Sequence, residues 1–126
     1  MPNDKVLVVD DDPGLQEVLR PLLEKAGYSV SLLSDGNSIV RGEIELPDIF
    51  LLDKQLSGVD GLDICRFLKT SDESLQIPVV MMSAAPHVQR LSAEAGADDF
   101  LEKPFSTPAL LAALARQIER PFHLSE

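Results

Sequence analysis

Acidic side chains stand directly after two apolar runs in this sequence. Asp10 and Asp11 follow the run over residues 5–9, and Asp53 follows the run over residues 48–52. Carboxylates that lie close together repel one another, and burial makes each charge more costly. A hard divalent cation compensates such a cluster, and Mg²⁺ suits it because Mg²⁺ binds through few carboxylates and retains water ligands. If the two runs end at one place, these acids predict a magnesium site.

A hydroxyl and an ammonium group follow two further apolar runs. Ser83 follows residues 77–82, and Lys103 comes two residues after the run over 99–101. Lys103 would add a fixed positive charge to that of the cation. Both charges could neutralise the oxygens of a phosphoryl group while a carboxylate attacks phosphorus. The combined set therefore favours transfer of a phosphoryl group to an aspartate.

The elements that must position these residues are of two alternating kinds. Five short runs are continuously apolar, which is typical of strands buried on both faces of a parallel sheet. They cover residues 5–9, 28–33, 48–52, 77–82 and 99–101. Helical spacing or helix-start signals lie between and after them, from Asp12-Pro13, over 38–45, from Asp60-Gly61, over 88–95 and from Thr107-Pro108.

Strict alternation of five strands with five helices predicts an α/β fold. Parallel strands need crossover connections, so we expect one five-stranded parallel sheet with helices on both faces. In open sheets of this kind, ligands bind at the carboxyl ends of the strands. The acids, the hydroxyl and the ammonium group all follow strands, so we expect them to meet at that edge.

These residues also carry a resemblance to a known family. The matching segments are Val8-Val9-Asp10-Asp11, Leu51-Leu52-Asp53 followed by Gly58-Val59-Asp60-Gly61, Met82-Ser83-Ala84, and Gly96-Ala97-Asp98 leading to Lys103-Pro104-Phe105. In order and spacing they resemble the receiver domain of two-component response regulators. The resemblance implies a flavodoxin-like (βα)5 fold with strand order 2-1-3-4-5. It covers residues 1–119 and leaves 120–126 as a tail or the start of a linker.

The resemblance implies a role for each matching acid. Asp53 would be the phosphoacceptor, taking a phosphoryl group from a phosphohistidine of a sensor kinase or of a phosphotransfer domain. Asp10, Asp11, Asp53 and the backbone carbonyl of Gln55 would hold Mg²⁺, with Asp11 binding directly and Asp10 largely through water. The implied protein is a signalling domain that assists its own phosphorylation and dephosphorylation and turns over no external substrate.

The resemblance also implies a switch that follows phosphorylation. Lys103 would pair with the phosphoryl group, and Ser83 would turn its hydroxyl toward it. Phe100 stands at the position of an aromatic ring that swings between exposed and buried. The Lys103–Pro104 peptide bond is cis in relatives. The face built from the fourth helix, the fifth strand and the fifth helix would then change its affinity for a partner or for a second copy.

A few positions depart from the family pattern. Ser57 replaces a proline that is common four residues after the acceptor, which predicts a looser loop. Lys54 places a positive charge beside the acceptor, and Phe100 lacks the hydroxyl of the more familiar tyrosine. Gln55 and Ala85 occupy positions that tune dephosphorylation in the family. None of these departures removes an essential group.

Other functions fit parts of the sequence. A small phosphatase of the haloacid dehalogenase type would use the D-x-D of Asp10 and Asp12, with Asp10 as nucleophile, but it leaves Asp53 without a role. A flavodoxin-like cofactor binder would need a phosphate-binding loop where this chain has three acids. A degenerate receiver that works by protein contact alone would not need Asp53, Ser83 and Lys103.

Composition narrows the classes of partner. The net charge is −10, from 21 acidic and 11 basic residues, and such a surface repels nucleic acid and anionic membranes. The single cysteine excludes an internal disulfide, and no apolar run approaches the roughly 20 residues of a membrane span. The N-terminus lacks the basic and apolar regions of a signal peptide. We therefore expect a cytoplasmic protein that contacts neither nucleic acid nor membrane directly.

Overall fold

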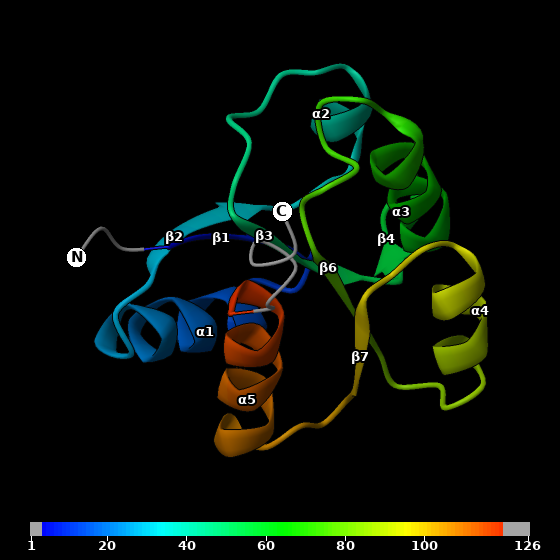
Figure 1. Cartoon of the computed structure of the whole chain (residues 1–126). Coiled ribbons are helices and arrows are strands. Elements are labelled where there is room, and N and C mark those ends of the chain that lie inside the picture. Colours follow the sequence, from blue (N-terminus) through cyan, green and yellow to red (C-terminus); the bar gives the residue numbers. More distant parts are fainter. Residues whose placement is uncertain (1–3, 120–126) are drawn as a thin grey trace.

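Five apolar runs form one parallel sheet in the computed structural model, which describes residues 4–119 (Figure 1). The strands are β1 (Lys5–Val9), β2 (Ser29–Leu33), β3 (Ile49–Asp53), β6 (Val79–Ser83) and β7 (Asp99–Glu102). Their order is β2-β1-β3-β6-β7, with every neighbouring pair parallel. Counted over these five strands, this is the expected order 2-1-3-4-5, so the predicted fold class is confirmed.

Helices cover both faces of the sheet (Figure 1). They are α1 (Pro13–Lys25), α2 (Asn37–Val40), α3 (Gly61–Thr70), α4 (Val88–Glu94) and α5 (Thr107–Ile118). Helices α1 and α5 pack on one face, and α2, α3 and α4 pack on the other. Asp12, Asp60 and Ser106 cap α1, α3 and α5, because each side chain accepts a hydrogen bond from a backbone N–H of the first turn.

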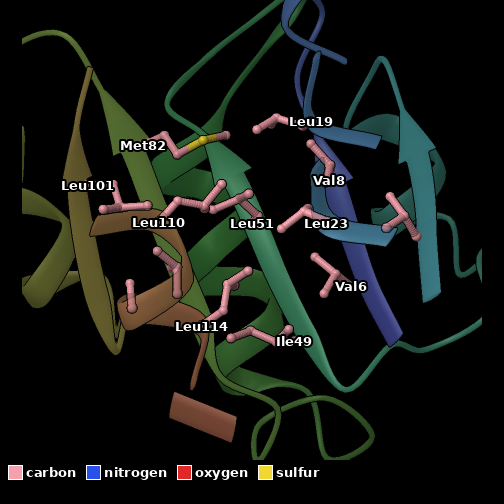
Figure 2. Close-up of a cluster of buried hydrophobic side chains, with 13 residues drawn as sticks. Val6, Val8, Leu19, Leu23, Ile49, Leu51, Met82, Leu101, Leu110 and Leu114 are labelled. Carbon is pink, nitrogen blue, oxygen red and sulfur yellow. The ribbon is translucent and has the colours of Figure 1, made fainter. Parts of the chain in front are cut away.

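The core consists of two layers separated by the sheet. Alternate residues of each strand point to opposite faces, so Val8 and Leu51 face one layer while their neighbours face the other. Figure 2 shows Leu19 and Leu23 of α1 and Leu110 of α5 pointing at the first layer. Every residue of β3 is buried. Burial on both faces explains why β1, β3 and β6 are continuously apolar in the sequence.

The expected helix over residues 38–45 is wrong in extent, because α2 makes a single turn from Asn37 to Val40. Its first residue follows Gly36, which supplies no capping side chain. Gly42 adopts a φ of +71° shortly after its end, a conformation that ends helices and suits glycine. Only Ile39 of this turn is buried, so little packing supports a longer helix.

A short hairpin that the sequence did not predict follows β3. Strands β4 (Gln55–Leu56) and β5 (Val59–Asp60) pair antiparallel, with Ser57 and Gly58 between them. Gly58 has a φ of +80°, which a turn of this length often requires and glycine adopts freely. The hairpin places residues 55–60 beside the carboxyl end of β3. Within residues 4–119, no helix is both long enough and apolar enough to cross a membrane.

Candidate functional site

Three aspartates converge at the carboxyl ends of β1 and β3. In the parallel pairing of these strands Val9 lies opposite Leu52, so the next residues, Asp10 and Asp53, also lie side by side. Single carboxylate oxygens of Asp10, Asp11 and Asp53 lie within 4.8 Å of one another. Asp10 is 0% exposed and Asp53 is 5% exposed, whereas Asp11 faces solvent. This arrangement offers oxygen ligands of the kind that Mg²⁺ prefers.

The ammonium group of Lys103 lies between the two buried carboxylates. Its Nζ donates a hydrogen bond to Asp10 Oδ2 at 2.9 Å and is 3.1 Å from Asp53 Oδ1. Burial lowers the pKa of Lys103, but the hydrogen bonds and charges of Asp10 and Asp53 outweigh it and hold the pKa above its ordinary value. The cluster therefore holds three carboxylates but one ammonium, which leaves negative charge for a further cation to neutralise.

The pKa of Asp53 is raised as well, but by a different balance of the same effects. Burial is the largest effect and raises the pKa of its carboxyl group, and the negative charge of Asp10 raises it further. The charge and hydrogen bond of Lys103 lower it without restoring the ordinary value. A bound cation would relieve the repulsion among the acids, so the donor set fits a divalent metal ion.

Local hydrogen bonds hold Asp10 in place. The backbone N–H of Asp12 donates to Asp10 Oδ1 at 2.9 Å, so both carboxylate oxygens of Asp10 are engaged. Gln16 of α1 donates from Nε2 to the backbone carbonyl of Asp10 at 2.7 Å and to that of Leu33 at 3.3 Å, which joins β1, β2 and α1. Asp12 itself caps α1 through the N–H of Gly14 and is no part of the acidic cluster.

The hydroxyl of Ser83 lies at the end of β6, next to the strand that carries Asp53. Ser83 is 4% exposed, and its Oγ accepts a hydrogen bond from the N–H of Ala85 at 3.1 Å. The N–H of Lys103 donates to the carbonyl of Ser83 at 2.8 Å, which ties the ends of β6 and β7 together. Phe100 of β7 is partly buried and packs against the core layer under α3 and α4. The Lys103–Pro104 peptide bond is cis.

The charge of Lys54, next to the phosphoacceptor candidate, is directed elsewhere. Its Nζ pairs with Asp60 at 3.2 Å across the hairpin. Gln55 lies in β4 with an exposed side chain, two residues after Asp53. The structure thus places the backbone of Gln55 at the same sheet edge as the acids.

Gly61 allows α3 to begin directly against the backbone of Asp53. A Cβ atom at Gly61 would lie 2.2 Å from the carbonyl oxygen of Asp53, closer than any side chain tolerates. The Gly61 N–H donates to the carbonyl of Lys54 at 2.8 Å. Sequence reasoning treated Asp60-Gly61 as a helix start, which is correct, but missed this close approach. A glycine after a capping residue indicates that the start of the helix is crowded, but it does not indicate which backbone group lies close to it.

A second contact that sequence reasoning missed joins the hairpin to the acidic cluster. The hydroxyl of Ser57 donates a hydrogen bond to Asp11 Oδ2 at 2.7 Å. The two residues are 46 positions apart, and no sequence pattern relates them. In the sequence, Ser57 stands out only as a departure from the proline of the family pattern.

Comparisons with known proteins agree on one family. The model of the response regulator receiver domain matches residues 6–115. The chain is 37% identical to the DNA-binding response regulator MtrA of Mycolicibacterium smegmatis, over 92% of this chain and 51% of that protein. It is also 37% identical to the phosphate regulon transcriptional regulatory protein PhoB of Rhizobium meliloti, over 92% of this chain and 52% of that protein. The chain thus spans about half the length of these curated relatives.

Among solved structures, the receiver domain of the sensor histidine kinase PA1611 from Pseudomonas aeruginosa is similar, with a TM-score of 0.83 and 30% identity. The match covers 93% of this chain and 98% of that one, and that structure has a magnesium ion coordinated in the active-site cleft. These matches give no support to a haloacid dehalogenase-type phosphatase. Family match, relatives and fold agree that this chain belongs to the response regulator receiver domains of two-component signalling.

Proposed function

We propose that this receiver domain accepts a phosphoryl group on Asp53, from a phosphohistidine of a kinase or of a phosphotransfer domain. The observation that carries the proposal is the different engagement of the two buried aspartates. Asp10 is fully buried and uses both carboxylate oxygens, one with the N–H of Asp12 and one with Lys103. Asp53 pairs with Lys103 through Oδ1, which leaves Oδ2 as the nucleophile.

The transfer is a substitution at phosphorus. Oδ2 of Asp53 forms the new O–P bond while the P–N bond to the donor histidine breaks, and its electron pair returns to the imidazole nitrogen. Lys103 already lies 3.1 Å from the other oxygen of Asp53, so its ammonium group can neutralise a phosphoryl oxygen without a large movement. The domain assists its own modification in this way and processes no other substrate.

A divalent cation completes the site. Asp10, Asp11, Asp53 and the backbone carbonyl of Gln55 would hold Mg²⁺. The excess of three carboxylates over one ammonium supports this assignment, as does the magnesium ion in the related receiver structure. When bound, the ion neutralises charge on the phosphoryl oxygens.

Ser83 and Phe100 are proposed to transmit the modification. Ser83 Oγ accepts from Ala85, which leaves its hydroxyl hydrogen free to turn to a phosphoryl oxygen. Such a turn would move the loop after β6, and the partly buried ring of Phe100 on neighbouring β7 would follow. The face of α4, β7 and α5 would then favour a different partner, or a second copy. The size of this shift between conformations is limited by the new contacts that the phosphoryl group makes.

We infer that the domain itself does not read nucleic acid. Its net charge of −10 opposes binding to phosphate backbones. MtrA and PhoB are named as DNA-binding or transcriptional regulators, and this chain matches about half of each. An effect on DNA would therefore pass through another domain or protein. We assign residues 1–119 to the receiver domain and 120–126 to a tail or linker, which lies outside the described residues.

Intact-mass spectrometry after incubation with acetyl phosphate tests the proposal. We expect one phosphoryl adduct that requires Mg²⁺ and is absent from Asp53→Asn. Asp10→Asn serves as the matched control, because it removes the neighbouring carboxylate and keeps the proposed nucleophile. An adduct that persists in Asp53→Asn and disappears in Asp10→Asn, with the loss not reversed by excess Mg²⁺, would make Asp10 the acceptor and overturn the proposal.

A further inference from the structure

A hydrogen bond between Ser57 and Asp11 joins the β4–β5 turn to the loop after β1. The Ser57 hydroxyl donates to Asp11 Oδ2 at 2.7 Å, and both residues are exposed. A hydroxyl that donates to a carboxylate at this distance makes a charge-assisted hydrogen bond, which is stronger than a neutral one. Such a bond can orient a side chain that the protein interior does not hold.

Asp11 needs this orientation more than its neighbours do. Asp10 and Asp53 are buried and contact Lys103, so packing and charge hold both side chains. Asp11 is exposed, and among residues 4–119 it is Ser57 that donates a hydrogen bond to its carboxylate. An exposed aspartate without a partner samples several rotamers, and binding a cation would then cost the entropy of selecting one.

The same bond also holds the hairpin that carries Gln55. Ser57 lies two residues after Gln55, on the turn that leads into β5. The bond therefore ties together two groups that are proposed to hold the cation, the carboxylate of Asp11 and the backbone carbonyl of Gln55. The contact leaves room for a metal ion, because a carboxylate has about four lone-pair positions and the serine occupies one of them on Oδ2.

We propose that Ser57 is a positioning residue for the divalent cation. Its hydroxyl holds Asp11 and the hairpin in the arrangement that binds the ion before the ion arrives, which raises the affinity for Mg²⁺. The inference rests on the proposed function, because it takes the acidic cluster to be a magnesium site. Proline at this position would stiffen the turn but would supply no hydroxyl, so the serine exchanges turn rigidity for a direct bond to Asp11.

The test measures Mg²⁺ binding to the unphosphorylated chain by calorimetry and by the backbone amide shifts of residues 55–60. Ser57→Ala removes the hydroxyl and should weaken Mg²⁺ binding about tenfold, the low end for loss of a partner that orients a metal ligand. Ser57→Thr keeps a hydroxyl and should bind like the wild type. Ser31→Ala, at an exposed serine of β2 away from the site, is the control for removing a serine hydroxyl and should leave binding unchanged.

Acetyl phosphate labelling separates positioning from chemistry. Ser57→Ala should need more Mg²⁺ for half-maximal labelling, yet reach the wild-type rate at saturating Mg²⁺. Equal or tighter Mg²⁺ binding by Ser57→Ala would overturn the inference, and so would a labelling rate that stays low at saturating Mg²⁺. Absence of Mg²⁺ binding by the wild type would instead refute the magnesium site itself, so the two failures are distinguishable.

Discussion

Lys103 should carry a large share of the stability of this fold, because it compensates two buried carboxylates. Its Nζ lies 2.9 Å from Asp10 Oδ2 and 3.1 Å from Asp53 Oδ1. At an effective dielectric constant of about 20, each contact corresponds to roughly 5 kcal/mol of gross Coulomb attraction, much of it offset by desolvation. Removing one partner of a buried ion pair costs about 3–5 kcal/mol. For Lys103→Met without divalent cations we expect the unfolding free energy to fall by about 3 kcal/mol at pH 7, the lower end of that range, because Lys103 is partly exposed.

The pH dependence of this loss has a definite sign. The pKa of Lys103 is raised in the folded protein above 10.5. A raised lysine pKa contributes stability that is fully present below the unfolded value and is lost as pH rises through the folded one. The difference between wild type and Lys103→Met should therefore stay constant from about pH 7 to 9 and shrink above 10.5. Added Mg²⁺ should reduce it, since a second cation then neutralises the same carboxylates.

Urea unfolding followed by circular dichroism measures this difference, with Lys25→Met as the control. Lys25 is an exposed lysine in the last turn of α1, so its removal should change the unfolding free energy by no more than about 0.5 kcal/mol. In the Asp53→Asn background, Lys103→Met should lower the unfolding free energy by less than it does in the wild type, because one of the two carboxylates that Lys103 compensates has been removed. If Lys103→Met matched the control, the ammonium would not be compensating the buried acids.

Three further predictions follow from the site and the core. Asp53→Asn should raise the unfolding free energy at pH 7, because a carboxyl group with a raised pKa contributes stability that is lost as pH rises through the folded value, whereas an amide does not ionise. Urea unfolding should show that this gain vanishes below pH 3.8, and the absence of a gain at pH 7 would contradict the prediction. Gly61→Ala should lower the unfolding free energy by more than about 1 kcal/mol and reduce phosphoryl labelling, because its Cβ would meet the Asp53 carbonyl; a stable, fully labelled variant would refute this contact. Burial raises the pKa of the Cys65 thiol to about 11, so the native protein should react with a thiol reagent at pH 8 far more slowly than the protein in urea; equal rates would show that the thiol is accessible.

Much of the fold could be predicted from patterns of residues that are close along the chain. Apolar runs predicted the five strands of the sheet, and the runs of β1, β3 and β6 are continuous because a strand buried on both faces has no polar side. The Asp12-Pro13 and Asp60-Gly61 pairs predicted the starts of α1 and α3, since a capping carboxylate needs only the N–H groups a few residues ahead. Where such support was weak, at residues 38–45, the sequence misjudged the length of α2.

The candidate site divides in the same way. That Asp10, Asp53 and Lys103 meet could be predicted, because the carboxyl ends of parallel strands lie at one edge of a sheet. The sequence does not predict how deeply each residue is buried, or that the Lys103 ammonium contacts both Asp10 and Asp53. Both features depend on which strands are neighbours and on which elements cover the strand ends. The hairpin after β3 and the approach of Gly61 to Asp53 were also decided in three dimensions.

The bond between Ser57 and Asp11 shows the limit most clearly. The sequence alone determined which residues follow which strand, because the strands are predicted by patterns of residues that are close along the chain. Only the tertiary structure decided that a turn hydroxyl would meet a carboxylate 46 residues away. Such a contact depends on the packing of β1 against β3 and on the path of the hairpin, and neither leaves a periodic trace in the sequence.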